Sequence, residues 1–457
     1  MLRETTQPAS AAPLSIAQQC VKLGFCPSGC PTYVLLGEED DSPRGRIRLM
    51  REMFERNEPP SRATVEHIDK CLSCLSCMRT CAVSVDYMHL VDQARAYINA
   101  RYRRPLADRA IRSMIGFTFA HPVLFRAAIV AARILGPLAT RLPARLRALV
   151  ELACSQKTAA SDTRRRQVFE AIGERRGRVA LAAGCVQRVI GPDINSATVR
   201  LLQRQGWEVV VVADVGCCGS LSLHLGDSDR ARRQASNAVQ GWYRELERNG
   251  LDAIIVNASG CGTTIKDYAH LFGPGEPLHA KASKVAEMAF DVSQWLARTG
   301  CTPSVIPRGY TVAYHDACSL RNGQRVTEPP RKLLTAAGFR VREIAEKHMC
   351  CGSAGTYNIL QPDIATRLGN RKAAAARDAG AQILAAGNIG CITQIRRYSS
   401  LPIVHTVELL DWATGGPMPA ALVGLPLSAE SEAAAPAGIL EGAPAPPATE
   451  HDKLSLW

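Results

Sequence analysis

Short apolar runs bounded by glycine recur through the second half of the chain and predict its architecture. Six of them, each ending in cysteine, are RVALAAGC (178–185), WEVVVVADVGCC (207–218), DAIIVNASGC (252–261), YTVAYHDAC (310–318), FRVREIAEKHMCC (339–351) and AQILAAGNIGC (381–391). Runs of this length predict buried strands, and helical stretches such as residues 194–205 separate them. The pattern therefore predicts parallel α/β units whose sheets are covered by helices on both faces.

The cysteines of these runs form an internal repeat, in which each half holds a Cys-Cys-Gly motif flanked by two single cysteines. The four positions of the first half and their counterparts in the second are Cys185, Cys217, Cys218 and Cys261, then Cys318, Cys350, Cys351 and Cys391. The first three recur after 133 residues and the fourth after 130. Open α/β sheets bind ligands at the carboxyl ends of their strands, so we expect these cysteines to gather there.

Four thiolates in each repeat suffice to hold one iron–sulfur cluster, and all eight could instead converge on a shared site. Alternatively they are small buried residues at strand ends, because free cysteine is often buried. The repetition of a vicinal pair favours ligation. His315 and His405 are candidate extra ligands or proton carriers, although a histidine at a strand end is more often a hydrogen-bonded structural residue. Cys154 and Cys301 have no counterpart in the repeat and are predicted to be structural.

A second cysteine-rich region lies at residues 14–100, which hold seven cysteines. Cys71, Cys74, Cys77 and Cys81 follow the spacing C-x₂-C-x₂-C-x₃-C of a ferredoxin-type run. In such a run three thiolates wrap one iron–sulfur cluster and the fourth reaches a neighbouring cluster. A zinc knuckle, or thiols without metal, is the alternative, but zinc sites usually present two separated pairs of ligands. The run therefore predicts iron–sulfur ligation.

The upstream run fits the same template with one gap. Cys20, Cys26 and Cys30 occupy three of its positions, and Leu23 stands where the remaining cysteine is expected. In paired runs of this kind, the last cysteine of each run binds the cluster of the other run. Cys30 therefore joins Cys71, Cys74 and Cys77 in one [4Fe-4S] set. Cys81 joins Cys20 and Cys26 in the other set. Because leucine cannot bind iron, that set holds a three-iron cluster, a four-iron cluster with water or a small ligand on the bare iron, or no cluster. The spacing resembles the three-iron site of succinate dehydrogenase and fumarate reductase iron–sulfur subunits, so we favour [3Fe-4S].

Composition places these cysteines in a reducing compartment. The chain has 457 residues, enough for two or three domains, and 17 cysteines. Residues 1–12 lack the apolar core of a secretory signal, so we expect a cytoplasmic protein whose grouped thiols bind metal rather than form disulfides. We find no uninterrupted apolar stretch that predicts a transmembrane helix.

Residues 101–150 are strongly basic, with ten arginines, no lysine and Asp108 as the one acid, and supply most of the net charge of +13. Within them Leu124–Leu135 alternates an apolar face with Arg126 and Arg133. This stretch could lie peripherally on an anionic surface at the inner face of the cell membrane. We favour the alternative, a solvated helical linker that packs over the cluster domain and whose arginines pair with acids on a partner. Nucleic acid is not an expected partner, because the charge lies in a linker and only 5% of residues are aromatic.

Together these features predict an α+α/β protein in five segments. They are a helical double-cluster ferredoxin-type domain at 14–100, a basic helical linker at 101–176, Cys-Cys-Gly repeats at 177–305 and 306–417, and a disordered tail at 426–457. The tail is rich in Ala, Pro, Glu and Ser and lacks the large apolar residues that a folded core needs.

Several motifs resemble known families. The Cys-Cys-Gly repeats resemble the cysteine-rich domains of heterodisulfide reductase and its relatives. Six motifs in order resemble the iron–sulfur subunit of bacterial glycolate oxidase (glycolate dehydrogenase), namely CPTY (30–33), DSPRGRI (41–47), NASGCG (257–262), YHDAC (314–318), GNIGC (387–391) and HTVELLDW (405–412). The resemblance covers about residues 16–417. The sequence departs from the family at Leu23, and from fuller Cys-Cys-Gly domains at Ala258 and Asn388, where a fifth cysteine would stand.

The resemblance implies an electron-transfer subunit. In that family a separate FAD subunit, with a related flavin-type companion, oxidises glycolate to glyoxylate, and the iron–sulfur subunit passes the electrons towards quinone. We expect no catalytic residue on this chain, which has no G-x-G-x-x-G motif opening a βαβ unit for a flavin. Iron–sulfur subunits of D-lactate or anaerobic glycerol-3-phosphate dehydrogenases have a similar layout. A thiol-based redox or metal sensor is the alternative from another class.

Overall fold

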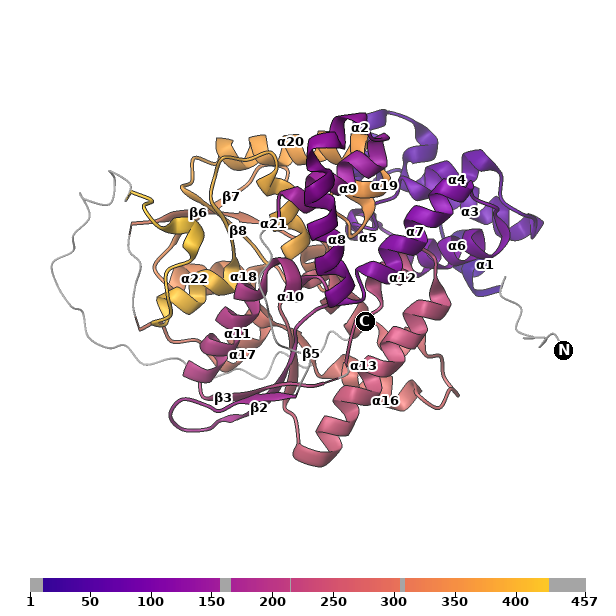
Figure 1. The fold of residues 1–457 in the computed structure, drawn as a ribbon. Helices are drawn as coiled ribbons and strands as arrows, with labels where there is room; N and C mark the ends of the chain where they lie inside the picture. Colours follow the sequence, from indigo (N-terminus) through magenta and orange to yellow (C-terminus); the bar gives the residue numbers. More distant parts are fainter. Residues whose placement is uncertain (1–10, 157–165, 214, 305–308, 427–457) are drawn as a thin grey trace.

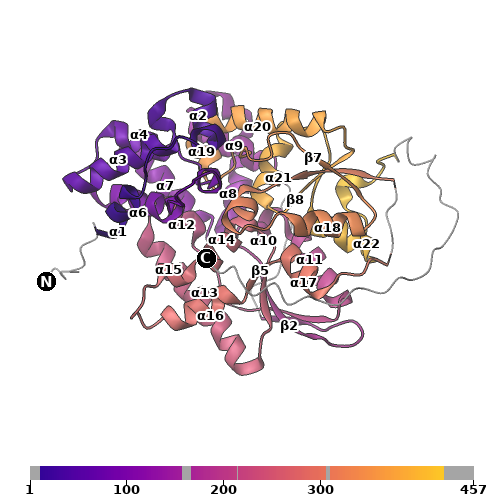
Figure 2. The same ribbon diagram turned by 180° about the vertical axis from the view of Figure 1, so that it is seen from behind.

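The computed structural model describes residues 11–156, 166–213, 215–304 and 309–426. Helices from the N-terminal third lie beside two α/β units, each built around its own sheet (Figure 1). The view from behind shows the same N-terminal helices next to both units (Figure 2). All but the first residue of the predicted disordered tail lies outside the described residues.

The N-terminal region is helical. Its elements are α1 (Ala11–Gln18), η1 (Pro27–Gly29), α2 (Pro31–Leu36), η2 (Glu39–Asp41), α3 (Pro43–Arg56), α4 (Arg62–Asp69), α5 (Ser76–Arg79) and α6 (Tyr87–Arg101). Helix α3 begins where Ser42 accepts a hydrogen bond from the Gly45 amide and Pro43 fills the first position, which needs no donor. Its apolar residues, including Met50 and Phe54, pack against α6 in one core.

The basic segment folds into α7 (Leu106–Thr118), α8 (Pro122–Leu135), η3 (Gly136–Arg141) and α9 (Ala144–Cys154). Asp108 on α7 accepts hydrogen bonds from Arg104, Arg112 and Arg145, so these arginines pair within the chain rather than with a partner. Among the described residues, Pro122–Arg141 is helical, has a mean hydropathy of 1.6, and is by length and composition able to span a membrane. The sequence pattern had not singled it out, because α8 and η3 become one continuous run only in the structure.

The first α/β unit has a five-stranded sheet of order β1-β3-β2-β4-β5. The strands are β1 (Gln167–Phe169), β2 (Gly177–Ala182), β3 (Trp207–Val211), β4 (Ala253–Val256) and β5 (Ala289–Asp291), and all neighbours are parallel except β1, which is antiparallel to β3. Its helices are α10 (Gln187–Ile190), α11 (Pro192–Arg204), α12 (Ser220–His224), α13 (Ser228–Asn249), α14 (Ser259–Lys266), α15 (Tyr268–Leu271), α16 (His279–Glu287) and α17 (Val292–Thr299).

The second unit has a four-stranded, fully parallel sheet of order β7-β6-β8-β9. The strands are β6 (Thr311–His315), β7 (Arg340–Glu343), β8 (Ile383–Ala386) and β9 (Ile403–His405). Its helical elements are the π-helical turn η4 (Ser319–Gly323), α18 (Glu328–Ala336), α19 (Tyr357–Leu360), α20 (Pro362–Asp378), α21 (Ile389–Arg396), α22 (Thr406–Ala413) and η5 (Ala420–Leu422). One apolar core runs through both units and joins them.

The prediction of two parallel α/β units is confirmed, and all six predicted strands form. Three strands were not predicted, namely β1, β5 and β9. Each has only three residues, too few for an apolar run to stand out, and pairs at or near a sheet edge.

Candidate metal centres

The glycine of each Cys-Cys-Gly motif is required by the backbone. Gly219 has φ 91° and Gly352 has φ 86°, in the left-handed region that favours glycine. A Cβ on Gly219 would lie 2.9 Å from the Ala231 carbonyl oxygen, and one on Gly352 would lie 2.8 Å from that of Ala365. The motif is therefore a tight turn that leads from the strand edge into a helix and holds the vicinal cysteines at the carboxyl end of the sheet.

The four cysteines of the first repeat come together. The sulfurs of Cys185 and Cys217 are 3.4 Å apart. Hydrogen bonds from the Cys185 and Cys218 thiols lower the pKa of Cys217 well below its usual range, while hydrogen bonds with Cys217 and Cys261 raise the pKa of Cys218. Cys261 is the third residue of α14, so its sulfur also lies near the positive end of a helix dipole.

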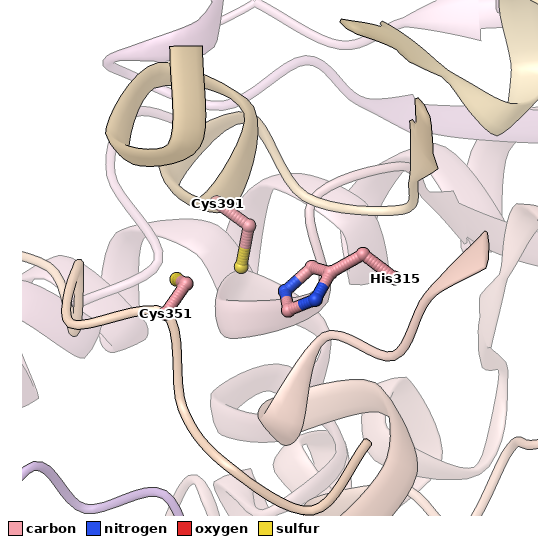
Figure 3. A group of neighbouring side chains, drawn as sticks. All are labelled: His315, Cys351 and Cys391. Atoms are coloured by element: carbon pink, nitrogen blue, oxygen red, sulfur yellow. The ribbon is translucent and has the colours of Figure 1, made fainter. Parts of the chain in front are cut away.

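The second repeat gathers its cysteines in the same way and adds a histidine. The sulfurs of Cys318 and Cys350 are 3.9 Å apart, and donor atoms of Cys351, Cys391 and His315 all lie within 4.8 Å of one another (Figure 3). Burial, followed by the charge of Lys372, lowers the pKa of His315 to about 3, so its ring is neutral, the form that binds metals. Asn388 replaces a cysteine here and donates a hydrogen bond to the Cys391 sulfur at 3.4 Å.

The remaining candidate residues, His405, Cys154 and Cys301, lie outside the cysteine groups and have structural roles. His405 caps α22, because its Nδ1 accepts a hydrogen bond from the Val407 amide at 3.1 Å. Cys154 is exposed on α9, and its sulfur contacts the Ala132 carbonyl oxygen at 3.8 Å. Cys301 packs at the edge of the main core, where burial raises its pKa to about 11. None of the three joins a cysteine group in the part of the chain that is described.

In the N-terminal region Cys30, Cys71, Cys74 and Cys77, here called the Cys30 set, line one small cavity, as the exchange of ligands between the two runs predicts. The sulfur of Cys71 accepts hydrogen bonds from the Ser73 amide and the Tyr87 hydroxyl. Burial and the thiolates of Cys71, Cys30 and Cys26 raise the pKa of Cys77. Cys30, Cys71 and Cys74 are buried and Cys77 is half-buried. Thiolates this close repel each other, so all four ionise together only where a cationic centre accepts their charge.

The other N-terminal group, here called the surface set, consists of Cys20, Cys26 and Cys81. Burial and the thiolates of Cys20 and Cys81 raise the pKa of Cys26, so the three are close enough to interact electrostatically. Leu23 is 58% exposed, on a loop where Lys22 and Gly24 have positive φ. The structure thus brings together the three cysteines of the incomplete set and directs the residue at the gap towards solvent.

The cysteine groups follow one another through the molecule. Cys26 of the surface set contributes to the raised pKa of Cys77 in the Cys30 set. Burial and the thiolates of Cys318 and Cys30 raise the pKa of Cys74, so the Cys30 set adjoins the second repeat. Cys74 and Cys350 also belong to one apolar cluster. All eight repeat cysteines line a single cavity, which completes the succession.

The donor sets fit iron–sulfur clusters. Each offers sulfur atoms, with one neutral histidine in the second repeat, and soft thiolate ligands select iron–sulfur clusters, zinc or copper(I) rather than magnesium or calcium. Sets of cysteines held at loop turns, with amide hydrogen bonds to sulfur, match the way iron–sulfur proteins tune their clusters. Iron–sulfur clusters would be held by the surface set, the Cys30 set and the two repeat sets.

A buried charged network beside the Cys30 set was not found from the sequence. Arg46 is 1% exposed, and its guanidinium donates to the Asp41 carboxylate at 3.3 Å and contacts the Cys30 sulfur at 3.8 Å. His67 and Lys70 also contact Asp41, each at 2.8 Å. Because Arg46, Lys70 and His67 already occupy the Asp41 carboxylate, its closeness to His67 marks a hydrogen-bonded ion-pair network rather than a metal site. The only sequence signal was an arginine inside the motif at residues 41–47.

Comparisons with known proteins agree with this geometry. Residues 179–266 and 312–396 each match the family model of the CCG cysteine-rich domain. The fold and the cysteine groups therefore define a protein with two such domains behind a helical, cysteine-bearing domain.

Full-length relatives are more specific. The glycolate oxidase iron–sulfur subunit of Escherichia coli (strain K12) is 33% identical over 400 residues, which cover 87% of this chain and 94% of that protein. A probable glycolate oxidase iron–sulfur subunit of Bacillus subtilis (strain 168) is 30% identical over 427 residues, with the same shares of 87% and 94%. Lactate utilization protein A of Oceanobacillus iheyensis is 25% identical over 51% of this chain and 96% of that protein. The chain belongs to the family of glycolate oxidase iron–sulfur subunits, and the resemblance seen in its motifs is confirmed.

Proposed function

We propose that this chain is the electron-transfer subunit of a glycolate oxidase complex. It takes electrons from an FAD-containing subunit, which with a flavin-type companion oxidises glycolate to glyoxylate, and passes them towards quinone. The observation that carries the proposal is the succession of cysteine groups from the surface loop at Cys26, through Cys74 and Cys77, to the paired groups of the repeats. Clusters bound there, [4Fe-4S] except for [3Fe-4S] at the surface set, would supply one-electron carriers.

The residues of this chain hold and insulate such carriers. Cysteine thiolates bind iron, amide and hydroxyl donors to sulfur stabilise the reduced form, and the apolar cluster around Cys74 and Cys350 keeps water from the passage between two groups. The full-length match to glycolate oxidase subunits favours glycolate over lactate, because the lactate utilization relatives match only about half of the chain.

The surface set offers a contact for the flavoprotein. Val21, Leu23 and Phe25 are large apolar residues exposed by 58%, 58% and 60% on the loop between Cys20 and Cys26. Exposed apolar clusters of this kind mark protein interfaces. Lys22 lies within the loop, and Arg44, which is paired with Glu39, lies beside Gly24. The flavoprotein would therefore present mainly an apolar patch. Docking there would bring the flavin next to the first carrier.

The first test is composition and electron delivery. Anaerobically purified complex should contain iron and acid-labile sulfide and reduce a dye with glycolate faster than with D-lactate or glycerol 3-phosphate. Cys74→Ser should lower the rate of electron transfer from the Cys30 set to the repeat cysteine groups at least tenfold. Cys154→Ser, outside every cysteine group, should leave this rate unchanged. A sulfide-free protein that binds zinc would contradict the proposal and favour a thiol-based sensor.

The second test concerns docking. Replacing both Val21 and Phe25 by Glu should weaken binding to the flavoprotein at least tenfold while iron content stays unchanged. Ile172→Glu, at an equally exposed apolar residue of the first repeat, should leave binding intact. Equal binding by all variants would show that the flavoprotein docks elsewhere.

A further inference from the structure

The cavity lined by the repeat cysteines extends beyond them to the helices of the basic segment. It has a volume of about 500 Å³ and lies between the carboxyl ends of the two sheets and the helices α7, α8 and α9. Its floor carries the eight cysteines, while its roof consists of side chains such as Ile115, Ile129 and Val150. Cavities of about 300–1,000 Å³ hold small molecules. Clusters on the cysteines would occupy the floor, and the side chains of the roof opposite them are apolar.

The wall of the cavity has almost no charge. Among the described residues that line it, none is Asp, Glu, Lys or Arg, although such residues make up 21% of the chain. A carboxylate or a phosphate buried there would have no counter-ion, which is unfavourable by several kcal/mol or more. This argues against a hydroxy acid or a nucleotide and favours a neutral, mainly apolar molecule.

A few polar atoms of the wall lack partners. Within the described part of the chain, four residues of the wall each have a buried side-chain atom that makes no hydrogen bond, namely Thr393 Oγ1, Asn358 Oδ1, Gln187 Oε1 and His224 Nδ1, and these atoms lie just behind the surface of the cavity. Thr393 lies two residues after Cys391 on α21, and Asn358 is tied to the same helix by its bond to Gln394. A hydroxyl donates to a carbonyl, and an amide oxygen accepts from a hydroxyl. These are the groups that the oxidised and the reduced forms of a quinone present.

The roof connects the cavity to an apolar outer surface. On α8, Phe125, Ile129 and Ala132 face inward and are buried, whereas its exposed residues are mostly apolar and include Arg133. Met114 and Leu135 line the cavity and are also 44% and 46% exposed. Figure 1 shows α8 beside α9, over the region where the units meet. The exposed apolar residues of the roof are Met114, Phe117, Val123, Leu124, Val130, Ile134, Leu135 and Leu138.

A surface that exposes this many large apolar side chains is covered by protein or by lipid. The arginines of residues 101–150 give the roof a strongly positive charge, which attracts anionic lipid headgroups. An anionic bilayer therefore matches both the apolar outer face and the charge around it. A molecule dissolved in that bilayer would reach the cavity next to Met114 and Leu135.

We propose that this cavity binds a quinone, which enters from an anionic membrane surface through the α7–α8 roof. The inference rests on the proposed function and adds the place and the environment of the acceptor. A quinone takes up two electrons, delivered singly from the clusters of the repeats, and two protons from water, and leaves as the quinol. The electrons come from the two-electron oxidation of the substrate on the flavoprotein.

The test places a large side chain in the roof so that it fills the cavity. In the complete complex, Ala132→Trp should lower glycolate-driven reduction of decylubiquinone at least tenfold and leave reduction of a water-soluble dye within twofold. Val130→Trp puts the same side chain on the outer face of the same helix and should change neither rate. In a direct binding assay, a photoreactive azidoquinone should label peptides of α8 and α21 in the wild type and in Val130→Trp, but not in Ala132→Trp.

Each result decides the question. Normal quinone reduction and labelling in Ala132→Trp would overturn the proposal, as would labelling confined to another region. If Ala132→Trp loses iron or fails to fold, Ile129→Phe and Thr393→Val apply the same criteria with smaller changes, and a tenfold weaker quinone response is expected from Ile129→Phe. A wild-type complex that reduces dye but not decylubiquinone would refute the quinone site alone. A complex without glycolate-dependent dye reduction would refute the proposed function.

Binding to the membrane surface is measured separately, by flotation with vesicles. Ile134→Glu, on the outer face, should reduce flotation of the complex with phosphatidylglycerol-containing vesicles at least fivefold without changing reduction of decylubiquinone in solution. Vesicles of phosphatidylcholine alone should bind less of the wild type. Unchanged flotation of Ile134→Glu, or loss of flavoprotein binding in its place, would show that a protein partner covers the roof and would overturn the membrane route.

Discussion

Arg46 shows how a single side chain acts on a metal centre without binding it. Its guanidinium is buried between the Asp41 carboxylate and the Cys30 sulfur, and its Nε donates to the His67 carbonyl at 2.7 Å. A fixed positive charge beside a cluster favours the reduced, more negative form and so raises the reduction potential.

Replacing Arg46 by Met should lower the reduction potential of the cluster held by Cys30 by roughly 60 mV or more, a factor of ten in the one-electron equilibrium. The same change should lower the free energy of unfolding by about 3 kcal/mol, because Asp41 loses one of its buried cations but keeps His67 and Lys70. Potentiometric titration followed by electron paramagnetic resonance measures the first effect. Arg46→Lys, which keeps the charge, should shift the potential much less, and an equal shift would assign the effect to packing.

Leu23 decides the type of cluster at the surface set. The three cysteines around it are together, and its side chain is exposed where a fourth ligand would stand. Air-oxidised wild type should show the resonance signal of a three-iron cluster, and Leu23→Cys should abolish it by supplying the missing ligand. Val83→Cys adds a thiol next to the same set but outside the template, and should leave the signal. Absence of the signal from iron-replete wild type would contradict the [3Fe-4S] assignment.

At the scale of elements, the Cys-Cys-Gly turn holds the vicinal cysteines at the carboxyl end of the sheet, where they can act as ligands. Gly219 and Gly352 adopt positive φ and approach the carbonyls of Ala231 and Ala365. Gly216 also has a positive φ, of 70°, but a Cβ on it would meet no heavy atom of the described residues within 4 Å. Gly219 and Gly352 therefore need glycine for space as well as for conformation.

Gly219→Ala should lower the free energy of unfolding by about 3 kcal/mol and reduce iron per chain, because the turn must move to relieve the contact with Ala231. Gly216→Ala should cost only about 1–2 kcal/mol, the penalty of a left-handed alanine. Chemical denaturation and iron analysis of the two variants measure the difference. Equal losses would mean that conformation alone, and not the close approach, requires the glycine.

At the scale of the whole molecule, a histidine joins the N-terminal helices to the first repeat. His89 on α6 contacts Asp86 through Nδ1, and its Nε2 lies 3.0 Å from both carboxylate oxygens of Asp267. Its ring stacks on His270 with the centroids 3.4 Å apart. Burial opposes the charged form, but the hydrogen bonds to Asp267 and Asp86 outweigh it and raise the pKa of His89 to about 10. Burial, followed by the charge of His89, lowers the pKa of His270.

Because the pKa of His89 is raised on folding, its stabilisation is complete below the unfolded value of about 6.5 and is lost as the pH rises through 10. His89→Gln should therefore lower stability by roughly 2 kcal/mol near pH 6, and the difference from wild type should shrink as the pH approaches 10. Thermal unfolding across this pH range measures the effect. His121→Gln, at an exposed histidine, should show no such trend, and a pH-independent effect of His89→Gln would attribute it to packing.

Local and repeated features could be predicted from the amino-acid sequence. Apolar runs ending in cysteine indicated six strands and two parallel units, since strand burial depends on short-range pattern. The spacing of the N-terminal cysteines, with Leu23 at the gap, indicated which thiols belong together, because in paired ferredoxin-type runs the last cysteine of each run serves the cluster of the other. The motifs identified the family.

Contacts between distant parts of the chain became known only from the folded molecule. The closeness of Cys74 to Cys318, the single uncharged cavity shared by both repeats, and the helix α8 that is apolar inside and mostly apolar outside all depend on packing between elements far apart in the chain. His315 and His405 occupy similar strand ends, yet one faces Cys391 and the other caps a helix. Spacing along the chain carries no information on such contacts, because side-chain direction and neighbours follow from how the two sheets and the roof pack together.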